Sequence, residues 1–417
     1  MNMMSEDAKA ILLLCGHLGQ EADAEPLEQA AYNQVVRWLL DQKLRPSDLL
    51  VPEHVSALAA ATGLAASRLT ALLKRGVKLG FAVEAWNQSG IGVICRSDPE
   101  YPVRFKTHLK EKAPPILFVA GDRALLQGGG LAVVGSRNVD AAGETFARDV
   151  AAWCARGGLP VVSGGARGVD QVAMTSALEA GGVVLGILAD TLLRRSVSRE
   201  ARYALSDGRL LLLSPYHPEA GFNVGNAMGR NKLIYAMADY GLVVSAEHKK
   251  GGTWEGAQEE LRRKPGRPVF VRMGGSVPLG NRKLIELGAV AFPSIAGSAE
   301  PATLLRNSAV TQTPQEQASE LPLFSQPSGG TRILSAFRET PPDQVVAPTP
   351  PPSVPAVASI YDAVLPLVLA ALEKPASLVE LAKRLEMSKL QLQAWLQRAL
   401  VEKKVRKLNR PVRYTRT

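Results

Sequence analysis

Short, nearly continuous apolar runs alternate with helix-like segments through the middle of the chain. Two of these segments, AAGETFARDVAAWCARG and QVAMTSALEAG, carry apolar residues at helical spacing. Uninterrupted runs of Val, Leu and Ile are typical of strands buried on both faces. The repeated strand–turn–helix order therefore predicts an α/β fold, a parallel sheet with helices on both faces. The predicted strands are LAVVGSR at 131–137, LPVVSGG from 159, VVLGILA at 183–189, LLLLSP at 210–215, YGLVVSAE at 240–247 and RPVFVR at 267–272.

The flanking regions have different patterns. Apolar residues recur at helical spacing in AYNQVVRWLLDQ and SRLTALLKRGVKLGF, which predicts a small helical, SAM-like accessory domain. Near the C-terminus three helical segments, two with Ser377 and Ser388 as predicted caps, precede the alternating basic segment VRKLNRPVRYTRT. Three helices and a hairpin wing describe a winged helix. The predicted domains are 1–88 (helical), 89–293 (α/β), 294–359 (Pro-rich disordered linker) and 360–417 (winged helix).

Composition locates the charge and excludes several classes of protein. The 417 residues carry a formal net charge of +10, concentrated as +7 in residues 91–293 and +7 in residues 360–417, which favours a polyanionic partner. Between these blocks, PPDQVVAPTPPPSVP at 341–355 holds seven Pro in fifteen residues, a composition typical of a linker. Three dispersed Cys argue against a disulfide scaffold, and the spacing of His and Cys matches no metal motif. We expect a cytoplasmic protein without a membrane segment.

Glycine turns follow the first two predicted strands, where ligands of parallel sheets bind. In GSR, Gly135 permits a tight turn, the Ser136 hydroxyl and backbone N–H groups can hold phosphate oxygens, and Arg137 can bind a phosphate with two hydrogen bonds. In SGGARGVD, three glycines allow close approach of the backbone to an anion and one Arg supplies charge. We assign Asp170 a structural role there, as a helix cap or a partner of that Arg. The second turn's candidates are Gly164, Gly165, Arg167 and Gly168.

Two later segments add further candidates. GRNKL is predicted to open a helix with a basic first turn, which suits phosphate; its candidates are Arg230, Asn231 and Lys232. GGTWEG resembles another phosphate loop through Gly251, Gly252 and Thr253. Trp254 is either a stacking surface or a core residue, and Glu255 either caps a helix or acts as a general acid or base. A P-loop is disfavoured because GxxxxGK[ST] does not occur in the sequence.

Taken in order, these motifs resemble the DNA-processing protein A (DprA, or Smf) family over about residues 85–293. YPVRF at 101–105, APPILFVAG at 113–121 and NRKLIELGAVAF at 281–292 complete the resemblance. It implies an extended Rossmann-like domain that binds single-stranded DNA as a homodimer and loads a RecA-type recombinase during natural transformation. It implies neither catalytic turnover nor a cofactor. It also adds Ser163 to the DNA-facing candidates. Residues 187–205 lack the family's usual glycine and Tyr-Pro, so the chain resembles a divergent member.

Several alternatives stay open at this point. The same turns could serve a nucleotide-sensing protein, or a phosphoribohydrolase of the lysine-decarboxylase-like group that uses Glu255. The winged helix could bind DNA or protein; its phosphate candidates are Arg406, Lys407, Arg410 and Arg413. ELPLF, residues Glu320–Phe324 of the linker, resembles a short sliding-clamp-binding motif.

Overall fold

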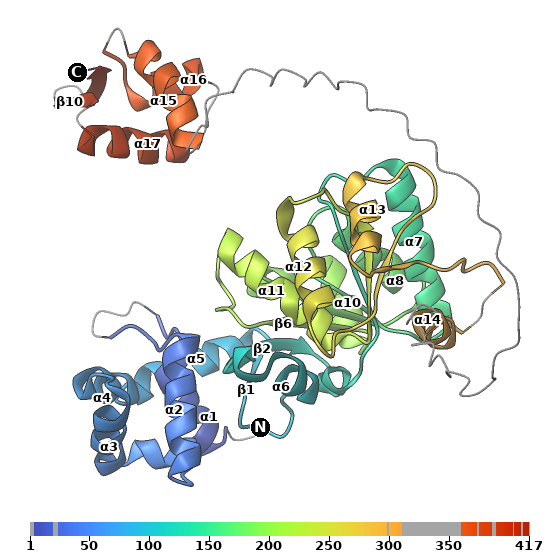
Figure 1. Cartoon of the computed structure of the whole chain (residues 1–417). Helices are drawn as coiled ribbons and strands as arrows, with labels where there is room; N and C mark the ends of the chain where they lie inside the picture. The colour runs from blue at the N-terminus through green and yellow to red at the C-terminus, as the bar shows by residue number, and fades with distance from the viewer. Residues whose placement is uncertain are drawn as a thin grey trace, which may run out of the picture. The chain divides into compact units, whose positions relative to one another are not determined.

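The computed structural model describes residues 4–19, 24–297, 300–310, 360–372, 375–385, 389–402, 404–409 and 412–416 (Figure 1). The chain forms two compact units, Met1–Glu320 and Leu321–Thr417. Each unit is described by itself below.

The first unit contains a nine-stranded sheet in the order β1-β2-β6-β5-β4-β3-β7-β8-β9. The seven strands from β6 to β9 are mutually parallel, whereas β2 runs antiparallel to both β1 and β6. The six predicted strands are confirmed as β3 to β8. The sequence pattern did not predict β1, β2 or the two-residue β9. The strands are β1 Gly92–Cys95, β2 Ile116–Gly121, β3 Leu131–Gly135, β4 Val161–Ser163, β5 Val184–Ile187, β6 Leu210–Ser214, β7 Tyr240–Ser245, β8 Val269–Val271 and β9 Val290–Ala291.

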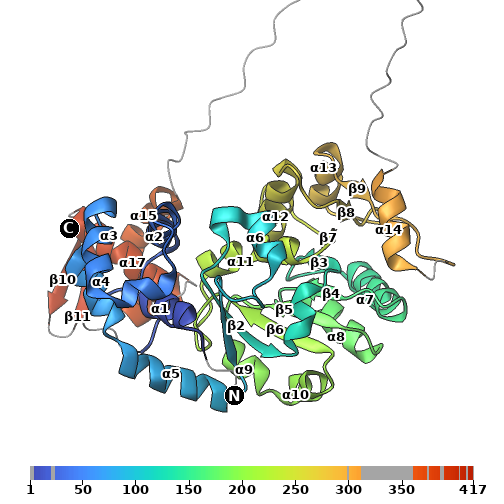
Figure 2. The same ribbon diagram turned by 90° about the horizontal axis from the view of Figure 1, so that it is seen from below.

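Helices cover both faces of this sheet, as Figures 1 and 2 show. In β3, Leu131 and Val133 enter one apolar core while Ala132 and Val134 enter the other, as expected from the two-residue period of a strand. The first core is covered by α7 Ala141–Arg156, α8 Val169–Glu179, α9 Leu192–Ser196 and α10 Arg199–Ser206. The second is covered by α6 Val103–Leu109, α11 Val224–Met237, α12 Gly251–Arg262 and α13 Leu279–Glu286.

The strand order places the topological switch point at β3. The chain proceeds from β3 to β4 on one side, and returns after β6 to place β7 on the other side. The loops at the carboxyl ends of β3 and β7 therefore leave the sheet in opposite directions, which opens a crevice between them.

The N-terminal helices pack against one edge of the sheet. Trp86 lies edge-on to Phe118 of β2, with ring centroids 4.9 Å apart. The amides of Gln29 and Asn33 donate to the carbonyl of Glu111, at 3.1 and 2.9 Å. Helices and sheet thus share one apolar core. The helical elements, with three short 3-10 turns, are α1 Glu6–Cys15, α2 Gln29–Asp41, η1 Pro46–Leu50, α3 Pro52–Thr62, α4 Ala66–Leu73, α5 Gly76–Gln88, η2 Lys110–Lys112 and η3 Arg123–Gln127.

Part of the predicted linker is helical. Residues Pro301–Val310 form α14, and Leu305 is fully buried in the first core. The prediction of disorder is wrong for this segment, because ATLLRNSAV places apolar side chains on one face of a helix. Residues 311–359, including the Pro-rich segment and the clamp-like motif Glu320–Phe324, lie outside the described residues.

The second unit contains three helices followed by a hairpin. Ser377 caps α16 as predicted, and forms a capping box with Glu380. Arg406 is exposed on β10, Lys407 and Arg413 fall on β10 and β11, and Arg410 lies outside the described residues. The winged-helix assignment stays a prediction. The elements are α15 Ile360–Ala371, α16 Leu378–Arg384, α17 Lys389–Val401, β10 Val405–Asn409 and β11 Val412–Arg416.

Across the segments that the structure describes, no helix combines the length and apolar character needed to cross a membrane. The same segments contain no cluster of three or more His, Cys, Asp or Glu side chains arranged to hold a metal ion.

Candidate nucleic-acid interface

Two neighbouring cavities open at the carboxyl ends of the central strands, beside a wider hollow of about 640 Å³ along the turns that carry Arg137 and Arg167. The larger cavity, about 430 Å³, lies over β3 and β7 between α11 and the start of α12. The smaller cavity, about 280 Å³, lies beside the turns that follow β4 and β5. Both therefore lie at the carboxyl ends of the strands, where the sequence predicts a ligand, and the larger one is at the switch point. The residues that line both cavities are Arg137, Ala166, Phe222, Ala227 and Arg230.

An internal carboxylate occupies the backbone donors of the glycine turns. The amides of Gly135, Gly164 and Ala166 donate to Asp170 at the start of α8. Burial raises the pKa of Asp170, while these hydrogen bonds and Arg230 oppose that shift. The structural role predicted for Asp170 agrees with this arrangement. These three amides are therefore taken up by an anion of the protein itself, and phosphate binding by the rest of the two turns stays a prediction.

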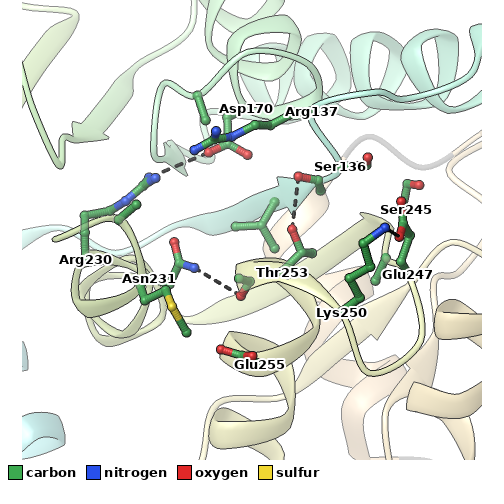
Figure 3. Close-up of a pocket in the computed structure, with 18 of the residues that line it drawn as sticks. Ser136, Arg137, Asp170, Arg230, Asn231, Ser245, Glu247, Lys250, Thr253 and Glu255 are labelled. Atoms are coloured by element: carbon green, nitrogen blue, oxygen red, sulfur yellow. Dashed lines mark hydrogen bonds and ion pairs between the residues drawn. The ribbon is translucent and has the colours of Figure 1, made fainter. Parts of the chain in front are cut away.

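Arg230 lies beneath both cavities and pairs with Asp170. Its Nη1 is 3.6 Å from a carboxylate oxygen of Asp170 and donates to the carbonyl of Ile187 at 3.2 Å. Figure 3 shows the side chain extending from α11 toward Asp170. Arg230 is 5% exposed, and its Nε has no hydrogen-bond partner in the part of the chain that is described. Burial lowers its pKa and Asp170 raises it. The buried Arg230 guanidinium, with an Nε that has no partner among the described residues, therefore lines both cavities.

The sequence places Arg230 and its neighbours wrongly within their helix. Residue Asn223 caps α11, so Arg230, Asn231 and Lys232 lie in the middle of the helix rather than in its first turn. The basic first turn inferred from GRNKL is therefore wrong. Asn231 lines the larger cavity and donates to the carbonyl of Gly252 at 3.0 Å. Lys232 is not one of the described residues that line either cavity.

Both serines of the glycine turns have partners within the protein. The Ser163 hydroxyl is fully buried and donates to the carbonyl of Val133 at 2.7 Å, so the DNA-facing prediction for Ser163 is wrong. The Ser136 amide donates to the carbonyl of Ser245, and its hydroxyl accepts from the amide of Asn138 at 3.1 Å. Ser136 lines the larger cavity but contributes mainly to the shape of the turn.

The Arg side chains of the two glycine turns are exposed and can contact a ligand. Arg137 lies over the ring of Phe222, with its guanidinium carbon 4.9 Å from the ring centroid. Arg167 donates to the side-chain oxygen of Asn138 at 2.7 Å. Neither guanidinium has a carboxylate partner within the described residues. Two exposed guanidinium groups of these turns are thus left for a ligand.

Three glycines of the second turn are required by its backbone conformation and close packing. Gly168 has φ +87°, and a Cβ there would overlap the carbonyl oxygen of Ser136. Gly165 has φ +65°, and a Cβ at Gly164 would overlap the guanidinium of Arg230. These positions therefore hold Arg230 and the two turns together at the site.

The GGTWEG segment is the first turn of α12 rather than a free loop. No side chain caps this helix, and Gly251, Gly252 and Thr253 line the larger cavity. The Thr253 hydroxyl donates to the carbonyl of Gly135 at 3.0 Å, joining α12 to the GSR turn. Lys250 pairs with Glu247 at 2.8 Å, as Figure 3 shows.

The two remaining side chains of that segment differ in environment. Trp254 is buried, with its ring edge-on to His248, so it is a core residue and not a stacking surface. Glu255 is exposed at the margin of the larger cavity.

Sequence reasoning missed two residues of the site. Phe222 comes from the loop between β6 and α11 and is 55% exposed, unusual for a Phe. Arg195 of α9 lines the smaller cavity and donates to the carbonyl of Gly165. The pair Arg194-Arg195, soon after a strand end, is the signal that could have indicated the second of these.

Comparisons with known proteins agree with this geometry. A family model described as DNA recombination-mediator protein A matches residues 92–300, half of the chain. The DNA processing protein DprA of Bacillus subtilis is 29% identical over 222 residues, which cover 52% of this chain and 72% of that protein. Protein Smf of Escherichia coli is 32% identical over 214 residues, half of each chain.

A solved structure agrees on the fold. DNA processing protein A of Streptococcus pneumoniae aligns with a TM-score of 0.54 at 20% sequence identity, over 70% of this chain and 96% of that one. The family model covers half of the sequence, and the solved structure agrees with the fold. The chain belongs to the DNA recombination-mediator protein A family, that of DprA and Smf.

Proposed function

We propose that this protein binds single-stranded DNA at the two cavities, and that it mediates recombination by protecting the strand and loading a RecA-type recombinase onto it. The observation that carries the proposal is the contact between Arg137 and Phe222. An unpaired guanidinium and an exposed ring meet where both cavities open. Single-strand-binding sites combine these two elements, cations for the phosphates and aromatic faces for the bases.

The site suits a strand better than a duplex. Phe222 protrudes beside the cavities, and only an unpaired base can lay its face against such a ring. The cations contact phosphates in any sequence, so we expect little dependence on sequence and a steep dependence on salt.

Fluorescence anisotropy with a labelled oligonucleotide tests this proposal. Arg137→Ala should weaken binding to the single strand, because it removes a phosphate contact at the opening of both cavities. Arg156→Ala is the matched control: Arg156 is exposed at the C-terminal end of α7, where the chain leads to the amino end of β4, away from the cavities at the carboxyl ends of the strands. Affinity that does not change between low and physiological salt would refute the proposal.

We propose a binding protein rather than an enzyme. A phosphoribohydrolase would use Glu255, but that carboxylate is exposed to solvent at the margin of the larger cavity rather than enclosed within it. Incubation with nucleoside monophosphates should release no free base. Release that is lost in Glu255→Ala would replace this proposal with the hydrolase.

Recombinase loading is tested separately from DNA binding. The full chain should shorten the delay before a RecA-type recombinase assembles on a strand coated with single-strand-binding protein, and Arg137→Ala should reduce that effect. We also propose a homodimer, which sedimentation would reveal as twice the 44.5 kDa chain mass. Pull-down with a Glu320–Phe324 peptide tests the clamp motif.

A further inference from the structure

We propose that the smaller cavity is the phosphate subsite of the DNA-binding site, with Arg195 as one of its ligands, and that the larger cavity holds the neighbouring base and sugar. This inference rests on the proposed function and assigns its chemistry to two separate places. The ligand chemistry is a phosphodiester group of a nucleic-acid strand.

The two cavities differ in the balance of their charges. The smaller cavity is lined by four guanidinium groups and one carboxylate: Arg137, Arg167, Arg195, Arg230 and Asp190. The larger cavity is lined by three cations and three carboxylates: Arg137, Arg230, Lys250, Asp170, Glu247 and Glu255. An anion therefore gains more in the smaller cavity.

Ion pairs within the larger cavity increase the difference in charge between the two cavities. In the larger cavity, Lys250 is 2.8 Å from Glu247, and Arg230 is paired with Asp170. In the smaller cavity Arg137, Arg167 and Arg195 have no carboxylate partner among the residues described. The buried Arg230, with its unpartnered Nε, forms the floor common to both.

Arg195 is held in position without losing its charge. One guanidinium nitrogen donates to the carbonyl of Gly165, the second glycine of the turn after β4. That oxygen is neutral, so the other N–H groups and the full charge remain for a ligand. The hydrogen bond also orients the planar group against the turn, which lowers the entropy lost when a phosphate binds.

The larger cavity has the surfaces that a nucleoside needs. Three exposed apolar side chains of the β6–α11 connection and α11 stand at its margin: Phe222, Val224 and Met228. Amides at the uncapped start of α12 also face it, but Glu247 and Glu255 beside them disfavour a second anion. Arg137 and Phe222 line both cavities, so one nucleotide can extend across the boundary.

Arg195→Gln and Arg195→Lys in the full chain test the assignment. Gln keeps a polar side-chain amide but is uncharged and shorter than Arg, whereas Lys keeps the charge. With a labelled oligothymidylate, Arg195→Gln should bind about tenfold more weakly, as expected for loss of a charged hydrogen bond. Its salt slope should fall by about 0.7, the value for one phosphate contact on a single strand. Arg195→Lys should keep the wild-type slope, and Arg156→Gln, the distant control, should match wild type throughout.

An oligonucleotide with abasic positions separates phosphate from base contacts. Arg195→Gln should lose the same factor on the abasic strand as on the normal one. A loss confined to the normal strand would place Arg195 against a base and overturn the assignment, as would an unchanged salt slope in Arg195→Gln while wild type binds. Wild type without salt-dependent binding would instead refute the proposed function itself.

Thymidine monophosphate distinguishes the source of the phosphate. It should compete with the oligonucleotide only at concentrations far above those of the strand, because one nucleotide makes few of the contacts. Competition at equal concentration would show a free-nucleotide site and overturn the assignment to a strand phosphodiester.

Discussion

Removing Arg230 while leaving Asp170 in place should destabilise the protein, and should do so in a pH-dependent way. The two side chains are 5% and 7% exposed, and Arg230→Met leaves the carboxylate buried without its cation. Loss of one partner of a buried ion pair costs about 3–5 kcal/mol. We expect the lower end, about 3 kcal/mol, because three backbone amides still donate to Asp170. At roughly 2 °C per kcal/mol for a large domain, the Tm should fall by about 6 °C at neutral pH.

The pH dependence follows from the direction of the Asp170 shift. Burial raises the pKa of Asp170 above its ordinary value of 3.8, and loss of Arg230 raises it further. A group whose folded pKa is raised stabilises the fold below its unfolded pKa, and this stabilisation is lost as pH rises through the folded pKa. The deficit of Arg230→Met relative to wild type should therefore shrink as the pH falls from 7 toward 5.

Urea unfolding followed by circular dichroism at pH 7 and pH 5 measures this deficit. Asp170→Asn combined with Arg230→Met removes both charges, so it should recover most of the lost stability at pH 7 and show little dependence on pH. A deficit of equal size at both pH values, or a double variant no more stable than Arg230→Met alone, would refute the reasoning.

Three further changes separate structural from binding roles. Ser163→Ala should lower the free energy of unfolding by about 1–2 kcal/mol, because the Val133 carbonyl loses its donor; oligonucleotide affinity should not change, and a weakened affinity would contradict the burial argument. Phe222→Ala should cost about 1–3 kcal/mol of binding on a normal strand and nothing on an abasic one, by anisotropy. Burial alone would raise the pKa of Glu260, but the hydrogen bond from His108 holds this pKa below its ordinary value of 4.5. The stability that Glu260 contributes should therefore be lost as the pH falls through the lowered pKa. Urea midpoints measured between pH 6 and pH 3 should fall less steeply in Glu260→Gln than in wild type.

Local patterns were sufficient to predict the framework of the site. The apolar runs that end at Gly135 and Ser163 are buried parallel strands, and their periodicity requires no knowledge of the rest of the chain. Ligands of parallel sheets bind beyond the carboxyl ends of the strands, so the glycine turns indicated the site, whereas the strand order and its switch point are known only from the structure. The sequence therefore located the correct edge of the sheet and most of the residues at it.

What the sequence could not predict depends on partners distant along the chain. Asp170 takes up three amides of the glycine turns, and its cation, Arg230, comes sixty residues later from the middle of a helix. The start of α11 was misplaced because VGNAMG, with two glycines, does not look like a first turn, although Asn223 before it is an effective cap. Arg195 reaches the site only because β5 lies next to β4.

The shared core of the N-terminal helices and the sheet has a consequence for how this chain can change over time. Ile116 and Phe118 of β2 are buried together with Leu12 and Trp86 of the helices. A descendant that lost residues 1–88 would expose these strand side chains to water, and would need polar substitutions on β2 at once. The helical segment is therefore part of the sheet's own core, and its loss or exchange would cost more stability than that of a domain on a tether.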